Sequence, residues 1–358
     1  SASLVGSEMC IRDRGHLVTP GLVDAHTHLI FGGWRQNELG LKLHGASYLD
    51  IQNAGGGIQS TTNATRQASE QELAAKASKA LDEMMGFGTT TVEAKSGYGL
   101  ATEHELKALE VIKDLNDHHR MDLVATFMGA HLVPAEYKSN REEYVRLVCE
   151  EMMPKVKEQG IAKFCDVFCE ADTFTVEESR QVLEAGLKYG LRPKIHADEI
   201  EAIGGSELAG EIGAVSAEHL IVCPPSGIAS MAEGGTVACC LPATSFYLGA
   251  AYAPVQDMVQ AGVPVAMATD FNPGSCPCLN MQLVISLGCL RYRLTPEQAL
   301  TAVTLNGAAA ICRADRIGSI EPGKQADILI WNAEDLDYIC YRLGSNLVDT
   351  VIKKGNVV

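Results

Sequence analysis

The stretch Pro20-Gly21-Leu22-Val23-Asp24-Ala25-His26-Thr27-His28 is an apolar run that ends in two histidines separated by one residue. The run predicts a strand over residues 17–25. Because residues i and i+2 of a strand point to the same side, both imidazoles are expected to face one space at its carboxyl end. Two histidines can fall at this spacing by chance, so their meaning depends on the rest of the chain.

Apolar, β-rich runs alternate with amphipathic stretches after this strand. Ser/Thr-x-x-Glu capping boxes at Ser69, Thr102 and Thr175 predict helix starts. The eight predicted strands are 17–25, 89–94, 123–128, 164–168, 193–196, 215–220, 236–241 and 263–269. Since parallel strands need crossover helices, eight such units predict an α/β protein with a TIM-like (β/α)8 barrel. An open, doubly wound sheet is the alternative.

The chain divides into three predicted parts. Residues 1–14 lack periodicity and are interpreted as a non-native or disordered start. Residues 15–315 carry the alternation of strands and helices and form the predicted barrel. Residues 316–358 begin with turn chemistry that feeds the apolar run 328–331, so they predict a small β-element outside the barrel.

Composition narrows the class of partner. The 29 Lys and Arg against 45 Asp and Glu give a net charge of −16, which disfavours nucleic acid and anionic membrane surfaces. No apolar run reaches the roughly 18–20 residues of a bilayer span. The twelve cysteines are scattered and no secretory segment opens the chain, which predicts reduced thiols and a cytoplasmic location. An anionic substrate would need a local basic pocket.

Three later predicted strands end in side chains of the same kind as the first. They end in Lys194-Ile195-His196-Ala197-Asp198-Glu199, Ala217-Glu218-His219-Leu220 and Ala268-Thr269-Asp270-Phe271-Asn272. The carboxyl ends of barrel strands meet at one rim, where barrel enzymes place their chemistry. The runs therefore predict a nitrogen-and-carboxylate site suited to Zn²⁺ or Fe. The alternative is a set of core histidines and a helix-capping aspartate.

Together with the tail motif Gly-Lys-x-Ala-Asp at 323–327, this pattern resembles the amidohydrolase superfamily from residue 18 onward. The resemblance implies one metal ion per chain, zinc or iron, held by four ligands: His26, His28, His196 and Asp270. A bound cation lowers the pKa of its water to about 7 and polarises a carbonyl. Asp270 would carry the water's proton to the leaving nitrogen, and His219 would orient or polarise the carbonyl.

Lys95 follows the predicted strand 89–94. Some members of the superfamily hold two metals bridged by a carboxylated lysine, and Lys95 is the candidate for that role. Pairing with Glu93 or another nearby carboxylate is the alternative.

Several longer segments resemble one family within the superfamily, the imidazolonepropionases. They are Phe31-Gly32-Gly33-Trp34-Arg35, Glu93-Ala94-Lys95-Ser96-Gly97-Tyr98-Gly99-Leu100, Phe127-Met128-Gly129-Ala130-His131 and Asp270-Phe271-Asn272-Pro273-Gly274-Ser275. The resemblance implies hydrolytic ring opening of 4-imidazolone-5-propanoate to N-formimidoyl-L-glutamate in histidine degradation.

The residue types suit that small anionic substrate. Arg35 can fork onto a carboxylate, with Tyr98 and His131 adding donors. Glu199, three residues after His196, can accept N–H bonds from the ring amidine. The remaining implied contacts, to the opened product, are Asn272, Gly274 and Ser275.

Two other functions would use the same barrel. A deaminase of guanine or a related heterocycle would share the ligands, but a neutral purine offers Arg35 and Tyr98 no carboxylate. A non-catalytic scaffold would be expected to lose ligands that are present here. Barrel hydrolases often pair through helices, so a homodimer is compatible with the fold, although no segment identifies an interface.

Members of the family begin with a strand-rich segment that completes a small β-sandwich with the tail. Residues 1–14 do not resemble it. We therefore expect the tail to be a remnant of that sandwich, with apolar surface exposed near 328–331 and a lower stability than a complete relative.

Overall fold

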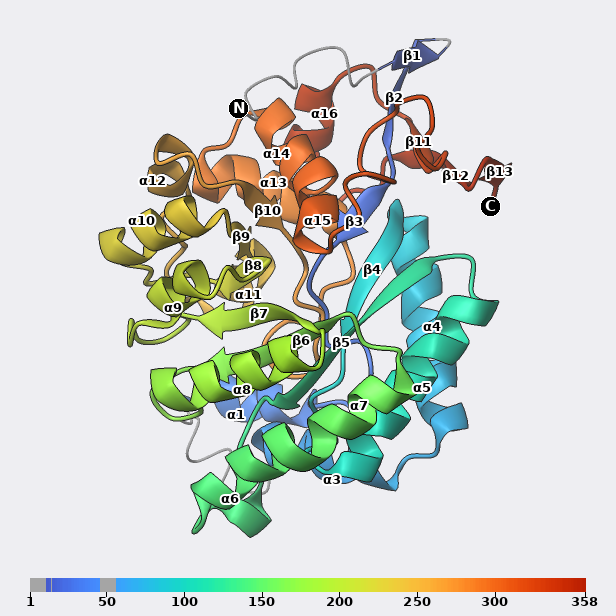
Figure 1. Ribbon diagram of the computed structural model, residues 1–358. Helices are drawn as coiled ribbons and strands as arrows, with labels where there is room; N and C mark the ends of the chain where they lie inside the picture. The colour runs from blue at the N-terminus through green and yellow to red at the C-terminus, as the bar shows by residue number, and fades with distance from the viewer. Residues whose placement is uncertain (1–10, 14, 46–55) are drawn as a thin grey trace.

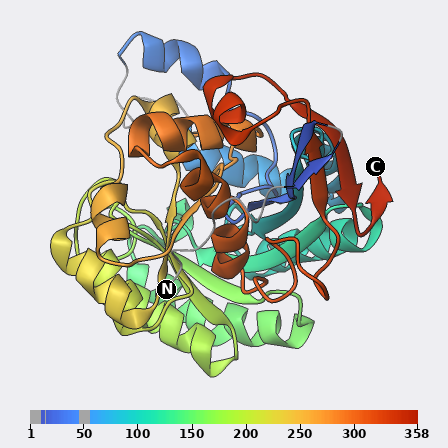
Figure 2. The ribbon, with the colours of Figure 1, turned by 90° about the horizontal axis from the view of Figure 1, so that it is seen from above.

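The computed structural model describes residues 11–13, 15–45 and 56–358, and its ribbon is shown in Figure 1. The predicted disordered start, 1–14, lies outside the described residues except for Ile11–Asp13, which form strand β1. Helices lie around the outside of a central parallel sheet in both views (Figures 1 and 2). In the described part of the chain, no helix is both long and apolar enough to cross a membrane.

The central sheet contains eight strands, and each is hydrogen-bonded to the next one in the chain. They are β3 (Leu22–Asp24), β4 (Thr89–Lys95), β5 (Asp122–Ala130), β6 (Phe164–Cys169), β7 (Arg192–Ala197), β8 (Ser216–His219), β9 (Val237–Cys240) and β10 (Val265–Met267). Every adjacent pair is parallel. This agrees with the predicted strand order.

The first and last strands meet just beyond their carboxyl ends. Thr27 forms a parallel bridge with Phe271. The amide of His28 donates to the Phe271 carbonyl at 2.9 Å, and the amide of Asp270 donates to the His26 carbonyl at 3.0 Å. The sheet therefore closes into the predicted (β/α)8 barrel, and the open-sheet alternative is wrong.

The helices connect the strands and complete the outer layer. They are α1 (Asn37–Leu43), α3 (Gly57–Gln67), α4 (Glu70–Gly86), α5 (Thr102–His118), α6 (Arg141–Arg146), α7 (Met153–Gln159), α8 (Val176–Lys188), α9 (Gly205–Glu211), α10 (Pro225–Gly234), α11 (Pro242–Leu248), α12 (Val255–Gln260), α13 (Met281–Tyr292), α14 (Pro296–Ala302), α15 (Leu305–Ala310) and α16 (Leu336–Tyr341). The main apolar core lies between these helices and the sheet. A second buried cluster joins residues of the strands, among them Val23, Phe164 and Ala266, to Ala308 and Ala310 of α15.

Two of the three predicted capping boxes are confirmed. Ser69 caps α4 and Thr175 caps α8, each with the reciprocal bond from the glutamate three residues later. The third prediction is wrong, because α5 begins after Ala101 with no side-chain cap. Glu105 is instead buried and accepts hydrogen bonds at 2.8–2.9 Å from three amides of the turn after β4, those of Gly97, Gly99 and Leu100. Those amides have no partner in a neighbouring strand, so they donate hydrogen bonds to the Glu105 carboxylate instead.

The predicted strand 17–25 is two strands in different sheets. It divides at Gly21 into β2 (His16–Pro20) and β3. A Cβ at Gly21 would lie 2.3 Å from Thr90 Oγ1, so a side chain there would block the close approach to β4. The strand β2 joins an antiparallel sheet of order β1-β2-β11-β12-β13, which also contains β11 (Ile328–Trp331), β12 (Val348–Lys353) and β13 (Asn356–Val357).

The expected exposure of apolar surface at 328–331 is wrong for Leu329 and Trp331, whereas Ile328 and Ile330 are partly exposed. Leu329 and Trp331 are fully buried, because β2 pairs with β11 along its whole length. The Trp331 indole Nε1 donates to Thr19 Oγ1 at 2.8 Å, which satisfies its polar end. Strands from both ends of the described chain thus build the small sheet beside the barrel.

Candidate active site

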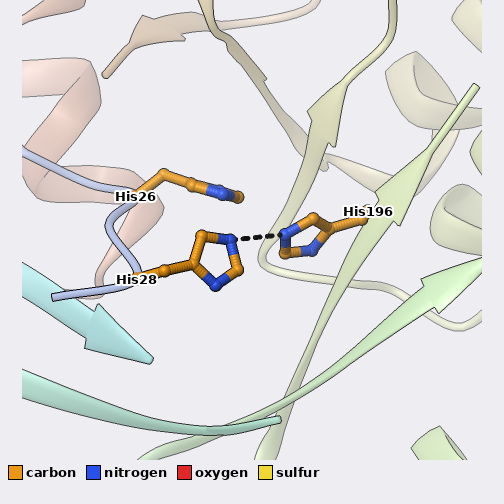
Figure 3. Close-up of side chains that lie close together, drawn as sticks. All are labelled: His26, His28 and His196. Atoms are coloured by element: carbon orange, nitrogen blue, oxygen red, sulfur yellow. Dashed lines mark hydrogen bonds between the residues drawn. The ribbon is translucent and has the colours of Figure 1, made fainter. Parts of the chain in front are cut away.

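Four histidines and one aspartate meet at the carboxyl rim of the barrel. They are His26 and His28 just after β3, His196 in β7, His219 at the end of β8 and Asp270 just after β10. Figure 3 shows His26, His28 and His196 pointing toward one another. All five side chains are buried. The rim predicted from the sequence is therefore assembled in the structure.

The ligand atoms of this group fit a metal ion. His28 Nε2 lies 3.3 Å from His196 Nε2 (dashed in Figure 3), and Asp270 Oδ1 lies 3.4 Å from His26 Nε2 and 3.6 Å from His28 Nε2. Bonds of about 2.0–2.1 Å in a tetrahedral site place ligand atoms roughly 3.3 Å apart. Two overlapping sets have ligand atoms within 4.8 Å of one another: His26, His28 and His196, and His26, His219 and Asp270.

The histidines have the protonation state that a cation requires. Burial is the main cause that holds the pKa values of His26, His28 and His219 well below their ordinary range, and it also lowers that of His196. Neutral imidazole is the metal-binding form. His26 Nε2 is buried without a hydrogen-bond partner among the described residues, and a cation would satisfy it.

Asp270 is held by polar contacts on the side away from His26. Its Oδ2 accepts a hydrogen bond from Thr244 Oγ1 at 2.7 Å, and its main-chain carbonyl accepts one from Asn272 Nδ2 at 2.7 Å. Burial raises the pKa of Asp270 to about 7. A carboxyl group that titrates near neutral pH can both take and give a proton.

Three strand ends at the rim have strained backbone. Asp198, His219 and Asp270 have φ values of 52°, 70° and 56°, in the left-handed region that non-glycine residues rarely adopt. Such strain persists only where surrounding structure over-determines it, and it concentrates at functional sites. Here it occurs after β7, at the end of β8 and after β10, and two of the three residues, His219 and Asp270, belong to the rim.

Arg35 lies beside the loop that follows β10. The carboxylate of Glu38 accepts from Arg35 Nε and Nη2, both at 2.9 Å, and so fixes the guanidinium. A Cβ on Gly274 would lie 2.3 Å from Arg35 Nη1, so the two residues are in direct contact. In the same loop, Asn272 Oδ1 accepts from the amides of Gly274 at 2.8 Å and Ser275 at 2.7 Å.

Tyr98 and His131 form the neighbouring wall. The His131 ring stacks on His28 with centroids 4.9 Å apart, and Tyr98 lies 5.2 Å from His131 and 5.8 Å from His28. His131 Nδ1 is hydrogen-bonded to the Gly97 carbonyl at 2.9 Å. Burial lowers the pKa of His131 to about 3, so its ring is neutral at physiological pH.

Glu199 lies next to His219, with 3.7 Å between Glu199 Oε1 and His219 Nδ1. Burial, followed by the charge of Asp270, raises the pKa of Glu199 to about 8. Burial therefore raises the pKa values of two carboxyl groups of the site, Asp270 and Glu199.

Comparison with known proteins agrees with this geometry. The amidohydrolase family model matches residues 17–358. The chain belongs to the amidohydrolase family. It is 55% identical over 98% of its length to an imidazolonepropionase of Alkaliphilus metalliredigens, and 53% identical over 96% to one of Geobacillus kaustophilus; the matches cover 83% and 81% of those relatives.

Solved structures of other amidohydrolases share the fold. A 5-methylcytosine deaminase from Klebsiella pneumoniae superimposes with a TM-score of 0.75 at 19% identity, over all of this chain and 90% of that one. An adenosine deaminase from Xanthomonas campestris with bound zinc gives 0.70 at 21% identity, over 96% and 80%. At these identities the likeness establishes the barrel and its accessory sheet.

The structure favours the ion-pair alternative for Lys95 in this amidohydrolase. Its Nζ lies 2.8 Å from Glu93 Oε1 and 2.7 Å from Asp166 Oδ2. Burial alone would lower the pKa of Lys95, but the charges of Asp166 and Glu93 outweigh burial and raise it. Carboxylation of a lysine needs the neutral amine, which these contacts disfavour.

Sequence reasoning missed the carboxylates behind the histidines. Glu218 Oε2 is hydrogen-bonded to His26 Nδ1, and Asp166 Oδ1 lies 3.1 Å from His196 Nδ1. Both carboxylates are fully buried. The available signal was an acidic residue inside an otherwise apolar barrel strand, since such residues are almost never fully buried unless paired.

Proposed function

We propose that this amidohydrolase opens the ring of 4-imidazolone-5-propanoate by hydrolysis to give N-formimidoyl-L-glutamate, a step of histidine degradation. One observation carries the proposal. The loop that continues from Asp270 approaches Arg35 at Gly274, which connects the group of four histidines and Asp270 to a guanidinium held by Glu38. That combination suits a hydrolysable ring that bears a carboxylate, and the relatives at 50–55% identity are named for this substrate.

One zinc or iron ion would be held by four ligands, since imidazole and carboxylate groups suit both metals. These ligands are His26, His28, His196 and Asp270. When bound, the ion supplies a water of lowered pKa and polarises the ring carbonyl.

Asp270 is the proposed proton carrier. Its Oδ1 faces the histidines while Thr244 holds its Oδ2, so the carboxyl group is fixed in orientation beside them. It would take the proton from the attacking water and deliver it to the leaving ring nitrogen. Neutral His219, on the adjacent strand end, would orient and polarise the carbonyl.

The substrate contacts follow from position. Arg35 would fork onto the propionate, with Tyr98 and His131 forming the wall beside it. Glu199 would face the ring nitrogens, where a carboxyl group with a pKa of about 8 can hold and release a proton. Asn272, Gly274 and Ser275 would hold the opened product.

Two alternatives make different predictions. A purine deaminase would share the metal ligands, but its substrate has no carboxylate, so Arg35→Gln would leave its KM unchanged. A non-catalytic scaffold would not need the rim residues that are all assembled here. We place the enzyme in the cytoplasm, in keeping with the free thiols throughout the described residues. A homodimer stays a prediction that analytical ultracentrifugation tests.

The deciding experiment follows the loss of ultraviolet absorbance of freshly prepared 4-imidazolone-5-propanoate, with metal content measured on the same sample. We expect turnover at about one metal per chain, abolished by Asp270→Asn. Asp315→Asn changes an exposed carboxylate outside the site and serves as the matched control. Turnover of guanine in place of the imidazolone would establish the deaminase. Absence of turnover of either ring by metal-loaded protein would refute the proposal.

A further inference from the structure

Beneath the rim, five charged side chains fill the centre of the barrel. They come from β4, β6, β7 and β8: Glu93, Lys95, Asp166, Lys194 and Glu218. Each is fully buried. Three carboxylates against two ammonium groups give a formal charge of −1. Buried charges of this kind persist only when they are paired and hydrogen-bonded.

The two lysines have different nearest carboxylates, although Lys95 Nζ also lies 3.7 Å from Glu218 Oε2. Lys95 Nζ lies 2.7 Å from Asp166 Oδ2 and 2.8 Å from Glu93 Oε1. Lys194 Nζ lies 2.9 Å from Glu218 Oε1. In both Asp166 and Glu218, one oxygen is therefore held by a lysine, and the other oxygen points to a histidine of the rim.

The second oxygens meet the Nδ1 atoms of two proposed metal ligands. Asp166 Oδ1 lies 3.1 Å from His196 Nδ1, and Glu218 Oε2 contacts His26 Nδ1. An ionised carboxylate only accepts, so each contact requires the proton on Nδ1. The proton is then absent from Nε2, which is the atom that faces the other ligands.

We propose that Lys95 and Lys194 are positioning residues for the metal site: they hold Asp166 and Glu218 so that His196 and His26 present bare Nε2 atoms to the cation. The inference rests on the proposed metal site and extends it to four groups that do not touch the metal. Outer partners of metal-binding histidines set the tautomer and ring orientation, and their loss typically weakens metal binding by about 10- to 100-fold.

The direction of the change in metal affinity distinguishes a positioning role of the lysines from a direct effect of their positive charge. If the lysines acted on the cation only through their positive charge, their removal would strengthen cation binding, because like charges repel. If they act by holding the carboxylates, their removal weakens binding. The two mechanisms therefore predict opposite changes in metal affinity.

The key variant removes Lys95 together with its second partner. In Glu93→Gln/Lys95→Met, the remaining charges are Asp166, Glu218 and Lys194, so the formal charge stays at −1 while Asp166 loses its lysine. The double variant also avoids an unpaired buried Glu93. Lys194→Met removes the hold on Glu218 independently. The exposed Lys163→Met, with the same loss of one positive charge, is the control.

The measurement is the zinc dissociation constant of the 358-residue chain, by competition with a chromophoric chelator. We expect the double variant and Lys194→Met to bind zinc about 10- to 100-fold more weakly and Lys163→Met to be unchanged. ¹⁵N shifts of labelled histidines in metal-free protein should report the Nδ1–H tautomer for His26 and His196 in the wild type and a mixture in the variants.

The inference would be overturned if the folded double variant bound zinc as tightly as the wild type within twofold, or more tightly. Should one variant fail to fold, the other decides, because each removes one of the two lysines that hold the carboxylates behind the histidines. Failure of the proposed function looks different: wild-type protein would bind zinc but not open the imidazolone ring, while the affinity changes would still appear.

Discussion

Replacing Gly274 by alanine should weaken substrate binding through Arg35. The backbone at Gly274 does not have a positive φ, so alanine meets no conformational barrier there. Its Cβ would lie 2.3 Å from Arg35 Nη1 and 2.7 Å from Cζ, whereas ordinary contact begins at 3.4 Å. The guanidinium must therefore move by 3.4 minus 2.3 Å, or 1.1 Å.

That movement breaks the geometry on which a carboxylate fork depends. Arg35 is held by two bonds of 2.9 Å to Glu38, and a 1.1 Å shift along either bond would lengthen it to about 4.0 Å, beyond hydrogen-bond range. A hydrogen bond to a charged group contributes about 1.5–3 kcal/mol. Loss of one such bond to the propionate corresponds to a rise in KM of about 10- to 150-fold, since 1.4 kcal/mol is a factor of ten.

The assay is steady-state ring opening with kcat and KM determined separately, beside a thermal melt. We expect KM to rise while kcat stays within a few-fold, because the reacting groups at the rim are untouched. Gly86→Ala is the matched control, since a Cβ there meets open space at the end of α4. An unchanged KM in folded Gly274→Ala protein would refute the assignment of Arg35 to the substrate carboxylate.

Three further changes test other parts of the molecule. Trp331→Ala should lower the free energy of unfolding by about 3–5 kcal/mol by chemical denaturation, because the side chain is fully buried; an effect no larger than that of the half-exposed Ile330→Ala would contradict this. Lys353→Met should lower the free energy of unfolding by about 3–5 kcal/mol, because it leaves the buried Asp327 carboxylate, 2.7 Å from Lys353 Nζ, without its cation and also removes the pair with the partly exposed Asp122. Burial would raise the pKa of Asp122, but Lys353 outweighs burial and holds that pKa below 3.8. The stabilisation that comes from this pair is therefore present above pH 3.8 and is lost as the pH falls through the pKa of Asp122 in the folded protein. A wild-type protein that stayed more stable than Lys353→Met in strong acid would argue against this reasoning. Glu199→Gln should reduce kcat by about 10²- to 10⁴-fold, since an amide cannot transfer a proton, and near-normal turnover would remove Glu199 from the chemistry.

Local patterns predicted most of the barrel. Each of the eight strands has a short apolar run, and two helices begin with capping boxes whose partners are three residues apart, so neighbours along the chain determine them. The rim residues could also be predicted, because every parallel barrel strand brings its carboxyl end to the same edge.

Local patterns gave a wrong prediction where groups distant in the sequence, or in the preceding turn, competed for the same residues. The apolar run 17–25 reads as one strand, yet its first half pairs with β11, more than 300 residues later in the chain. Thr102 and Glu105 have capping-box spacing, but the Glu105 carboxylate accepts hydrogen bonds from amides of the preceding turn instead. In both cases the competing groups satisfy more backbone hydrogen bonds than the local alternative.

The sequence by itself determined the barrel, its rim of histidines and Asp270, and the family, because these depend on periodicity, on strand ends and on motifs within short segments. Only the tertiary structure decided what lies behind the rim. Asp166, Lys194 and Glu218 stand in three different strands and carry no shared motif. Their pairing depends on which side chains the closed barrel points inward at the same depth, and that is a property of strand register.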